Sequence, residues 1–176
     1  MIIKIYTIPI IKNFNINKDK EKVITAYQNT FEGPPWFENW NIEDVSKLIS
    51  EAYSQKGFKG LILEKEKLVL GFAFGYSVPN KDTKTVKFSK INRMLLEKGW
   101  QNSFYLAECG VIQNYQNKNI GNNLISKLKE KSPELIFRTT NPNMIKVIEK
   151  QYSQPVEILF NDPIELERNW YGVRTK

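Results

Sequence analysis

Residues 103–126, SFYLAECGVIQNYQNKNIGNNLIS, decide the fold of this chain. An apolar, β-prone run that includes Phe104 and Val111 leads into a short polar turn, and a helix opens after it at residues 121–124. In such a turn the backbone N–H groups converge on the helix N-terminus, where the helix dipole adds about half a positive charge. The stretch therefore predicts an anion site that suits a pyrophosphate.

The rest of the chain is consistent with a single domain that spans residues 1–176. Of its 176 residues, 41% are hydrophobic and 12% are aromatic, which is enough for a substantial core. No Ser/Gly/Pro-rich linker divides the sequence, and no repeat recurs at the period of a solenoid.

Several kinds of catalytic site are excluded by composition. The chain has no histidine and one cysteine, so the common transition-metal ligand sets cannot be built, and we expect no metal. Ser-His-Asp and Cys-His catalysis are excluded for the same reason. Any chemistry must use carboxylates, tyrosine, lysine or backbone amides. Cys109 lies in an apolar strand, where an inert thiol is the favoured interpretation over a nucleophile.

We expect a soluble, cytoplasmic protein. The opening run MIIKIYTIPIIK is too short, and too interrupted by Lys4, for a signal peptide. No stretch reaches the roughly 18 apolar residues that a membrane span needs. A single cysteine also fits a reducing compartment.

The formal net charge of +7 does not by itself predict a nucleic-acid surface. Lysine and arginine are spread along the chain and mixed with acids, as in KDKEK at residues 18–22, so we expect no nucleic-acid partner. A denser basic group could form a ligand-facing rim or could serve solubility alone. Its members are Lys81, Lys84, Lys87, Lys90 and Arg93.

Hydrophobic periodicity and turn signals predict helices packed on a mixed, mostly antiparallel sheet, an α/β sandwich of the α+β kind. Residues 15–18 supply cap-type residues before the first helix, Gly33-Pro34-Pro35 ends that helix, and Asn41 is expected to cap the second. The expected strands cover residues 2–8, 61–63, 68–76, 103–112, 135–139, 156–160 and 170–174. The expected helices cover residues 18–32, 41–56, 91–96, 121–131 and 142–150.

These features together resemble the GCN5-related N-acetyltransferases, the GNAT superfamily. The acyl-CoA signature of that family is a strand ending in valine, then Gln/Arg-x-x-Gly-x-Gly/Ala, and residues 111–121 read VIQNYQNKNIG. Asn119 replaces the first glycine, and asparagine tolerates a left-handed conformation better than most residues. Residues 141–156, NPNMIKVIEKQYSQPV, are similar to the family's Asn-rich helix.

The resemblance implies acetyl-CoA as co-substrate and a central sheet that is flanked by helices on both faces and whose strands splay at the acyl-CoA site. Main-chain amides of the turn would cradle the pyrophosphate, Lys118 would add Coulomb attraction, and Val111 would pair its backbone with the pantetheine arm. The implied cofactor-binding residues are Val111, Gln116, Asn117, Lys118, Asn119, Ile120, Gly121, Asn122 and Asn141.

For catalysis the resemblance implies direct attack of an amine on the thioester in a ternary complex. Glu108, three residues before Val111, is the candidate base, although a structural carboxylate is an equal alternative. The family's tyrosine acid maps onto Ile148, which cannot donate a proton. Tyr152, one turn further on, is the candidate replacement, with a packed core tyrosine or protonation by water as alternatives.

The acceptor is expected to be a primary amine of a small molecule. Trp36 and Glu38, with Phe37 and Trp40, lie beside Pro34-Pro35 in a loop that the resemblance places over the acceptor pocket. Glu32 is a further candidate to orient a cationic acceptor. Transfer to a protein or peptide amine, or a catalytically weak CoA-binding module, are the alternatives. The sequence leaves the oligomeric state open, and a homodimer is compatible with it.

Overall fold

A computed structural model describes residues 8–78 and 86–175, with side chains in the third helix from residue 90 onward. The strands are β1 (Ile10–Asn13), β2 (Lys59–Lys65), β3 (Leu68–Ser77), β4 (Phe104–Val111), β5 (Glu134–Thr139), β6 (Glu157–Asn161) and β7 (Asn169–Arg174). The helices are α1 (Ile16–Glu32), α2 (Ile42–Tyr53), α3 (Val86–Glu97), the 3₁₀ turn η1 (Gln113–Tyr115), α4 (Ile120–Lys129) and α5 (Pro142–Tyr152).

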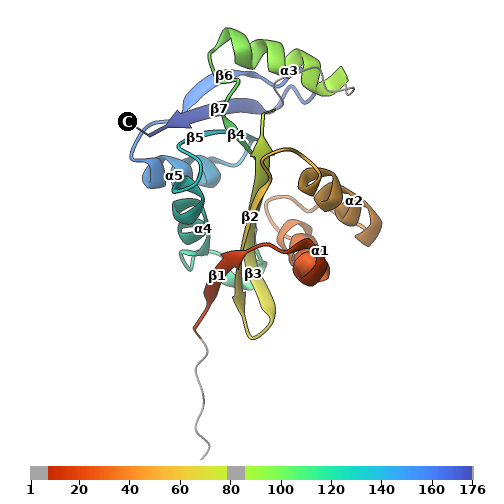
Figure 1. Cartoon of the computed structure of the whole chain (residues 1–176). Helices are drawn as coiled ribbons and strands as arrows, with labels where there is room; N and C mark the ends of the chain where they lie inside the picture. Colours follow the sequence, from red (N-terminus) through yellow and green to blue (C-terminus); the bar gives the residue numbers. More distant parts are fainter. Residues whose placement is uncertain (1–7, 79–85, 176) are drawn as a thin grey trace, which may run out of the picture.

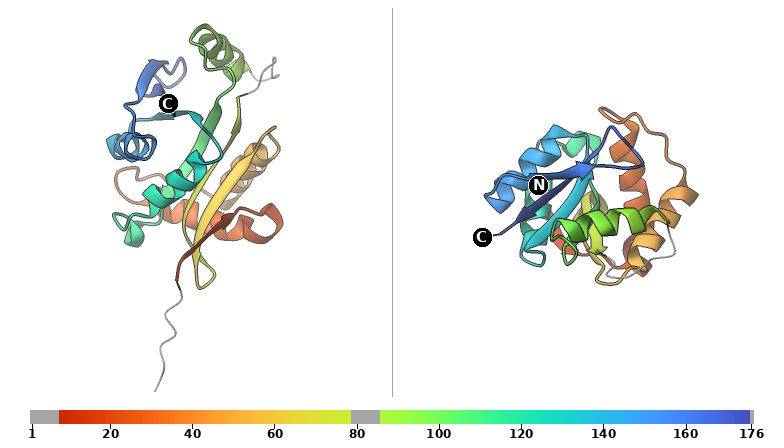
Figure 2. Two further views of the ribbon diagram at one scale, coloured as in Figure 1. Left: turned by 60° about the vertical axis from the view of Figure 1, so that its left-hand side comes forward. Right: turned by 90° about the horizontal axis from the view of Figure 1, so that it is seen from above.

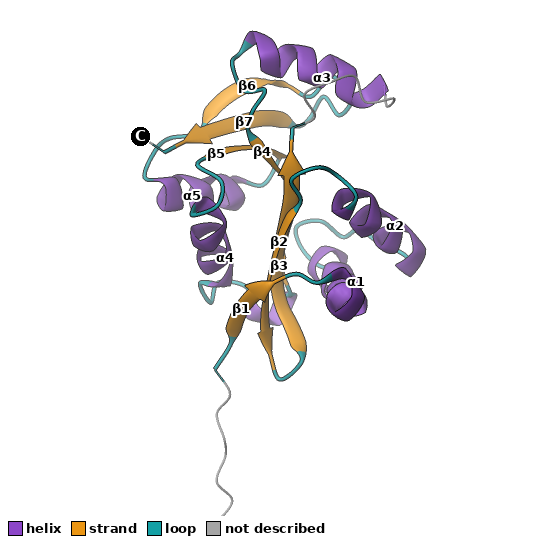
Figure 3. Ribbon diagram, viewed as in Figure 1, coloured by secondary structure: helices purple, strands orange, loops and turns teal. Residues whose placement is uncertain are grey.

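The strands form one twisted sheet in the order β1-β2-β3-β4-β5-β7-β6 (Figure 3). Among the described residues, neighbouring strands pair in antiparallel fashion except β4 and β5, which are parallel. A parallel neighbour needs a crossover, and η1 with α4 supplies it. The predicted mixed, mostly antiparallel sheet is therefore confirmed.

Helices cover both faces of the sheet, as the sequence predicts (Figures 1 and 2). In Figure 1 the sheet is seen close to edge-on, with α1 and α2 on one side and α4 and α5 on the other. The view from above in Figure 2 shows the same separation. Each helix turns an apolar stripe inward, for example Val23 and Tyr27 of α1 and Leu124 and Leu128 of α4, all nearly inaccessible to solvent.

A second, smaller hydrophobic cluster lies under α3, beside β6 and β7. Ile91 and Leu95 of α3 pack there with Trp100, Tyr105 and Trp170. Of the basic group predicted at residues 81–93, the side chains of Lys81, Lys84 and Lys87 lie outside the described residues.

Most predicted elements are confirmed within a few residues at each end. Asn15 and Asn41 cap α1 and α2, each accepting a hydrogen bond from a backbone N–H of the first turn. The predicted strand at residues 2–8 lies almost wholly outside the described residues, and the first strand observed is β1, from Ile10. A side chain on Gly75 would come within 1.9 Å of the Tyr105 carbonyl oxygen, at the bulge between β3 and β4. The register of the two strands shifts between Phe74 and Gly75, where the absence of a side chain lets the two backbones approach closely.

In the described part of the chain, no helix has the length and apolar character that crossing a membrane requires.

Candidate active site

The candidate site is a cleft that opens where β4 and β5 diverge. The two strands pair only at Phe104 with Leu135 and at Tyr105 with Ile136. Beyond these pairs a cavity of about 640 Å³ passes between the strands and reaches both faces of the sheet. One wall comes from α4, α5 and the turn before α4, and the other comes from α1 and the loop that follows it. The predicted splaying of strands is thus present.

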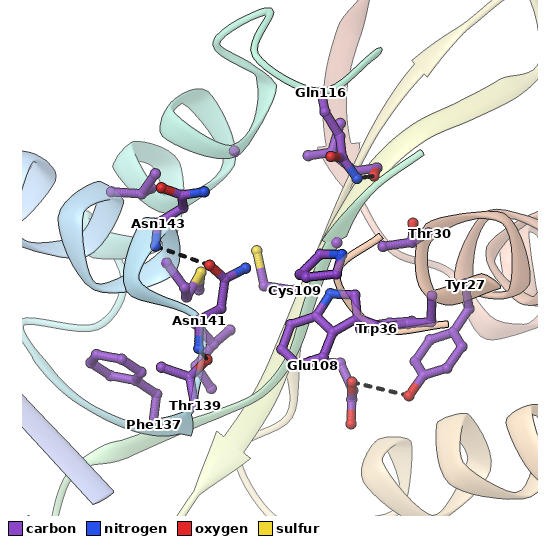
Figure 4. Close-up of a pocket in the computed structure, with 18 of the residues that line it drawn as sticks. Tyr27, Thr30, Trp36, Glu108, Cys109, Gln116, Phe137, Thr139, Asn141 and Asn143 are labelled. Carbon is purple, nitrogen blue, oxygen red and sulfur yellow. Dashed lines mark hydrogen bonds between the residues drawn. The ribbon is translucent and has the colours of Figure 1, made fainter. Parts of the chain in front are cut away.

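The edge of β4 presents backbone hydrogen-bonding groups to this cleft. The N–H of Ile112 donates to the Leu70 carbonyl oxygen at 3.0 Å, so it points toward β3. Backbone groups alternate in direction along a strand, and those of Val111 and Cys109 therefore point away from β3, toward the cleft. Gln116 confirms this direction, because its side-chain amide donates to the Val111 carbonyl oxygen at 3.2 Å across the mouth of the cleft (Figure 4).

The turn between β4 and α4 forms an anion-binding nest. Asn117 and Asn119 both adopt the left-handed conformation, with φ of 60° and 67°. The prediction that Asn119 supports the turn in place of glycine is confirmed in this respect. In the part of the chain that the structure describes, the backbone N–H groups of residues 117–122 donate to no acceptor in the protein. The helix dipole of α4 adds positive potential at the same place.

Lys118 is the member of the predicted cofactor set that lies outside the cavity wall. Its ammonium group donates to the Asn114 carbonyl oxygen at 2.9 Å and lies 4.7 Å from the centroid of the Tyr115 ring. The side chain is exposed and folds back onto the 3₁₀ turn. Its predicted contact with the cofactor would require it to leave both partners. The other predicted cofactor residues line the cavity, as do Trp36 and Glu38.

Asn141 lies on the wall formed by α4 and α5, at the N-cap of α5. Its side-chain oxygen accepts from the Asn143 N–H at 2.9 Å, and its own N–H donates to Thr139 Oγ1 at 2.9 Å. These two bonds fix the side chain, and its amide nitrogen is left directed into the cleft (Figure 4). A fixed donor at this point suits an acceptor group on an extended ligand.

Glu108 projects from β4 toward α1, on the face opposite Asn141 (Figure 4). Tyr27 of α1 donates its hydroxyl hydrogen to Glu108 Oε2 at 3.2 Å. Burial raises the pKa of Glu108 to about 7, although the Tyr27 hydrogen bond and the charges of Arg138 and Arg168 lower it. The nearby charge of Glu38 raises it further. A carboxyl group with this pKa can accept a proton at neutral pH and then release it.

Cys109 also lines the cavity, but it is a poor nucleophile. Burial and the charge of Glu108 raise the pKa of its thiol to about 12. The thiolate is the reactive form of cysteine and is scarce at pH 7 under these conditions. The sequence interpretation of an inert thiol agrees with this environment.

The structure does not support Tyr152 as a general acid. Its side chain is 2% exposed, and its hydroxyl donates to the Ser132 carbonyl oxygen at 2.7 Å, away from the cavity. Ile148, which takes the place of the family's tyrosine, is fully buried. Residues 148 and 152 are one helical turn apart, so both project onto the face of α5 that packs against the core. Tyr152 is therefore a core residue.

The loop after α1 contributes Trp36, Glu38 and Trp40 to the second wall of the cavity. The N–H of Glu38 donates to the Phe31 carbonyl oxygen at 2.8 Å, which fixes this residue to the end of α1. Phe37 lies outside the wall, with a side chain that is 74% exposed. Glu32 is likewise exposed and does not line the cavity.

Sequence reasoning missed the charged residues on the remaining side of the cavity. Arg138 of β5, with Glu165 and Arg168 from the loop between β6 and β7, lines the cleft. Arg138 bonds to Asp162 at 3.0 Å and to Glu165 at 2.8 Å. An arginine is unusual inside an apolar run such as LIFRT, and this was the sequence signal that could have identified Arg138. No sequence signal links the loop to β5. Among the described residues, no group of three or more acidic, cysteine or histidine side chains is arranged to hold a metal ion.

Comparison with solved structures identifies the fold. An acetyltransferase structure from Desulfovibrio desulfuricans assigned to the GNAT family matches with a TM-score of 0.60 and 11% identity, over 96% of this chain and 100% of that chain. This chain has the GNAT fold. PaiA N-acetyltransferase from Thermoplasma acidophilum, solved in complex with coenzyme A, matches with a TM-score of 0.59 and 14% identity, over 95% of this chain and 99% of that one.

A third GNAT-fold match is the ribosomal-protein-alanine N-acetyltransferase from Brucella melitensis. Its TM-score is 0.62 and its identity 16%, over 94% of this chain and 99% of that one. No protein-family model matches the sequence, and no curated protein matches it significantly. At these identities the likeness establishes the fold, and the GNAT-like arrangement of the sheet is confirmed.

Proposed function

We propose that this protein is an acetyl-CoA-dependent N-acetyltransferase that acetylates a primary amine of a small molecule by direct attack in a ternary complex. The observation that carries the proposal is the nest at residues 117–122, whose backbone N–H groups donate to no acceptor among the described residues and which opens into a cleft bordered by the edge of β4 that faces away from β3. A diphosphate fits the nest, and an extended pantetheine arm fits the edge of β4. One neighbour with this fold was solved with coenzyme A bound.

The amine must lose a proton before it can attack. An alkylammonium group has a pKa of about 10, so at neutral pH it needs a base in or near the site. Glu108 serves this role, directly or through a water molecule, because its pKa of about 7 lets it take the proton at neutral pH. Tyr27 orients the carboxylate through its 3.2 Å hydrogen bond.

The amine nitrogen then forms a bond to the thioester carbon, and the carbonyl oxygen becomes an oxyanion. A cleft-facing N–H of β4, with Val111 the leading candidate, donates to this oxyanion. When the tetrahedral intermediate collapses, the attacking nitrogen loses its second proton to solvent, the C–S bond breaks and the electron pair leaves on sulfur. Since Tyr152 is turned away, water protonates the thiolate, and its pKa near 8.5 makes this step undemanding.

A second candidate function is a CoA-binding regulatory module with little turnover. It is favoured by one observation, which is that isoleucine stands at residue 148 and no tyrosine hydroxyl replaces the family's acid there. Both candidates predict cofactor binding, and only the first predicts catalysis.

Two measurements test these proposals together. Thermal unfolding with and without acetyl-CoA reports binding, because a ligand that prefers the folded state raises Tm. Release of free CoA thiol from acetyl-CoA, screened against a broad amine library that includes peptides, reports turnover and acceptor class. Absence of any Tm shift at millimolar acetyl-CoA would refute both functions. A shift without thiol release with any amine would leave the regulatory module.

A further inference from the structure

The charged side chains on the acceptor side of the cavity form two groups. In one group the positive and negative charges balance, and the other group consists of carboxylates outside that set. Arg138 bonds to Asp162 and Glu165, and Arg168 bonds to Glu165 at 2.9 Å. Two guanidinium groups thus face two carboxylates, and this set is neutral as a whole. The other two carboxylates that line the cavity are Glu108 and Glu38. Glu108 is assigned to the proton of the reacting amine under the proposed function, which leaves Glu38 to be explained.

Glu38 has no basic partner. Within residues 8–78 and 86–175, no lysine or arginine forms an ion pair with it. Its Oε2 accepts a hydrogen bond from the indole N–H of Trp40 at 2.7 Å, and its side chain is partly buried in the cavity wall. Partial burial of a carboxylate costs free energy, and at Glu38 no ion pair with the described residues offsets that cost. In a chain with a net charge of +7, a cavity-lining carboxylate that forms no ion pair with the described residues is informative about what the cavity binds.

The surroundings of Glu38 suit an organic cation. Trp36 and Trp40 line the same wall, and aromatic faces attract cations through the ring quadrupole. The Trp40 ring meets Tyr27 edge-on, with centroids 5.5 Å apart, and Tyr27 bonds to Glu108. Glu38 and Glu108 are therefore connected through two rings, as separate anionic points on one wall of the cavity.

The wall is also held in place before any ligand arrives. Backbone bonds fix Glu38 to the end of α1, and Gln28 donates its side-chain amide to the Trp40 carbonyl oxygen at 2.7 Å. Gln113, in the turn before α4, donates to the Thr30 carbonyl oxygen at 2.8 Å and so connects this segment to the cofactor side. A preformed subsite loses little entropy on binding.

We propose that the acceptor carries a second positive charge besides its reacting amine, and that Glu38 with the indoles of Trp36 and Trp40 binds this second cation. The acceptor class is then a small diamine or an aminoalkyl compound with a distant ammonium group. This inference rests on the proposed function, which assigns Glu108 and the β4 edge to the reacting amine.

A matched pair of acceptors tests the proposal. The first is an aminoalkyl trimethylammonium ion, and the second is the same primary amine with an uncharged tert-butyl group in place of the trimethylammonium. Only one nitrogen of the first compound can be acetylated, so the comparison isolates the charge. We expect kcat/KM to favour the cation by about tenfold, as for a charge-assisted contact. Glu38→Gln keeps the shape and the oxygen that accepts from Trp40, and should bring the ratio close to one.

Glu32→Gln is the matched control, because it removes the same charge from an exposed residue outside the cavity. It should keep the wild-type ratio. Calorimetric binding of both compounds to the protein saturated with CoA gives the same comparison without turnover. Equal affinities of the two compounds for the wild-type protein, or a preference that survives in Glu38→Gln, would overturn the inference. The proposed function fails separately, if CoA does not bind or no amine is acetylated.

Discussion

Gly121 offers the sharpest test of the cofactor site, because a side chain there has free space inside the protein and yet enters the cleft. A Cβ added at Gly121 would have one neighbour within 4 Å, the Val111 Cγ2 atom at 4.0 Å. Gly121 also lines the cavity, in the first turn of α4. Gly121→Leu should therefore fold normally while filling the volume in front of the amide nest.

The expected magnitudes follow from helix propensity and mass action. Replacing glycine by leucine in a helix stabilises it by about 0.8 kcal/mol, and for a chain of this size each kcal/mol changes Tm by about 2–4 °C. The variant should therefore unfold at the wild-type Tm or a few degrees above it. Acetyl-CoA at about one hundred times Kd stabilises the wild-type protein by about 2.7 kcal/mol, which raises Tm by roughly 5–11 °C. That shift should vanish in Gly121→Leu.

The assay is thermal unfolding with and without acetyl-CoA, supported by calorimetry. Asn123→Leu is the matched control, since it adds the same side chain to α4 at an exposed residue outside the cavity, and it should keep the shift. Gly121→Ala should lose affinity only in part. If Gly121→Leu keeps the full shift, the diphosphate does not bind at this turn. If it unfolds well below the wild-type Tm without ligand, the inferred free space is wrong.

The remaining predictions concern the catalytic groups and the turn. In the wild-type protein, kcat/KM should rise with pH through about 7 as Glu108 loses its proton, and Glu108→Gln should abolish this limb and lower kcat by about 10²–10⁴. Tyr27→Phe removes a hydrogen bond that favours the carboxylate, so the limb of the pH profile should move to higher pH; an unchanged limb would assign it to another group. Tyr152→Phe leaves the Ser132 carbonyl oxygen unpaired and should lower stability by about 1–3 kcal/mol with kcat unchanged, whereas a large fall in kcat would restore Tyr152 as a candidate acid. Asn119→Gly should keep CoA binding, while Asn119→Val should cost about 1–2 kcal/mol in denaturant unfolding, because φ is 67° there.

The side of the cleft that carries the amide nest was predictable because it is local in sequence. Residues 103–126 contain the strand, the turn and the helix start, and their conformations depend on neighbours a few positions away. The left-handed conformation of Asn119 follows from its residue type and its place between a polar turn and an apolar helix. Caps at Asn15 and Asn41 were predictable for the same reason, since a cap is a bond between residues two or three apart.

The differences between the sequence predictions and the structure lie in side-chain directions that sequence spacing does not determine. Tyr152 is one turn from Ile148, and that spacing puts both on the same face of α5, but only the packed structure reveals that this face meets the core. Lys118 stands in the right turn, yet its flexible side chain finds a carbonyl oxygen and an aromatic ring on the outer surface. In both cases the residue was near the site in sequence and directed away from it in space.

The two sides of the cleft are therefore built by different means. This explains why one side could be predicted from the sequence and the other could not. The nest uses main-chain amides of one continuous segment, so many sequences can form it if the turn conformation is kept. The acceptor side combines side chains from four separate segments, for which Tyr27, Glu38, Arg138 and Glu165 are examples. Their proximity depends on the packing of α1 and of the β6–β7 loop against the sheet. Under the proposed function, acceptor specificity can then change through a few side chains without disturbing cofactor binding. The charge of Glu38, which forms no ion pair with the described residues, is informative because the fold does not require it.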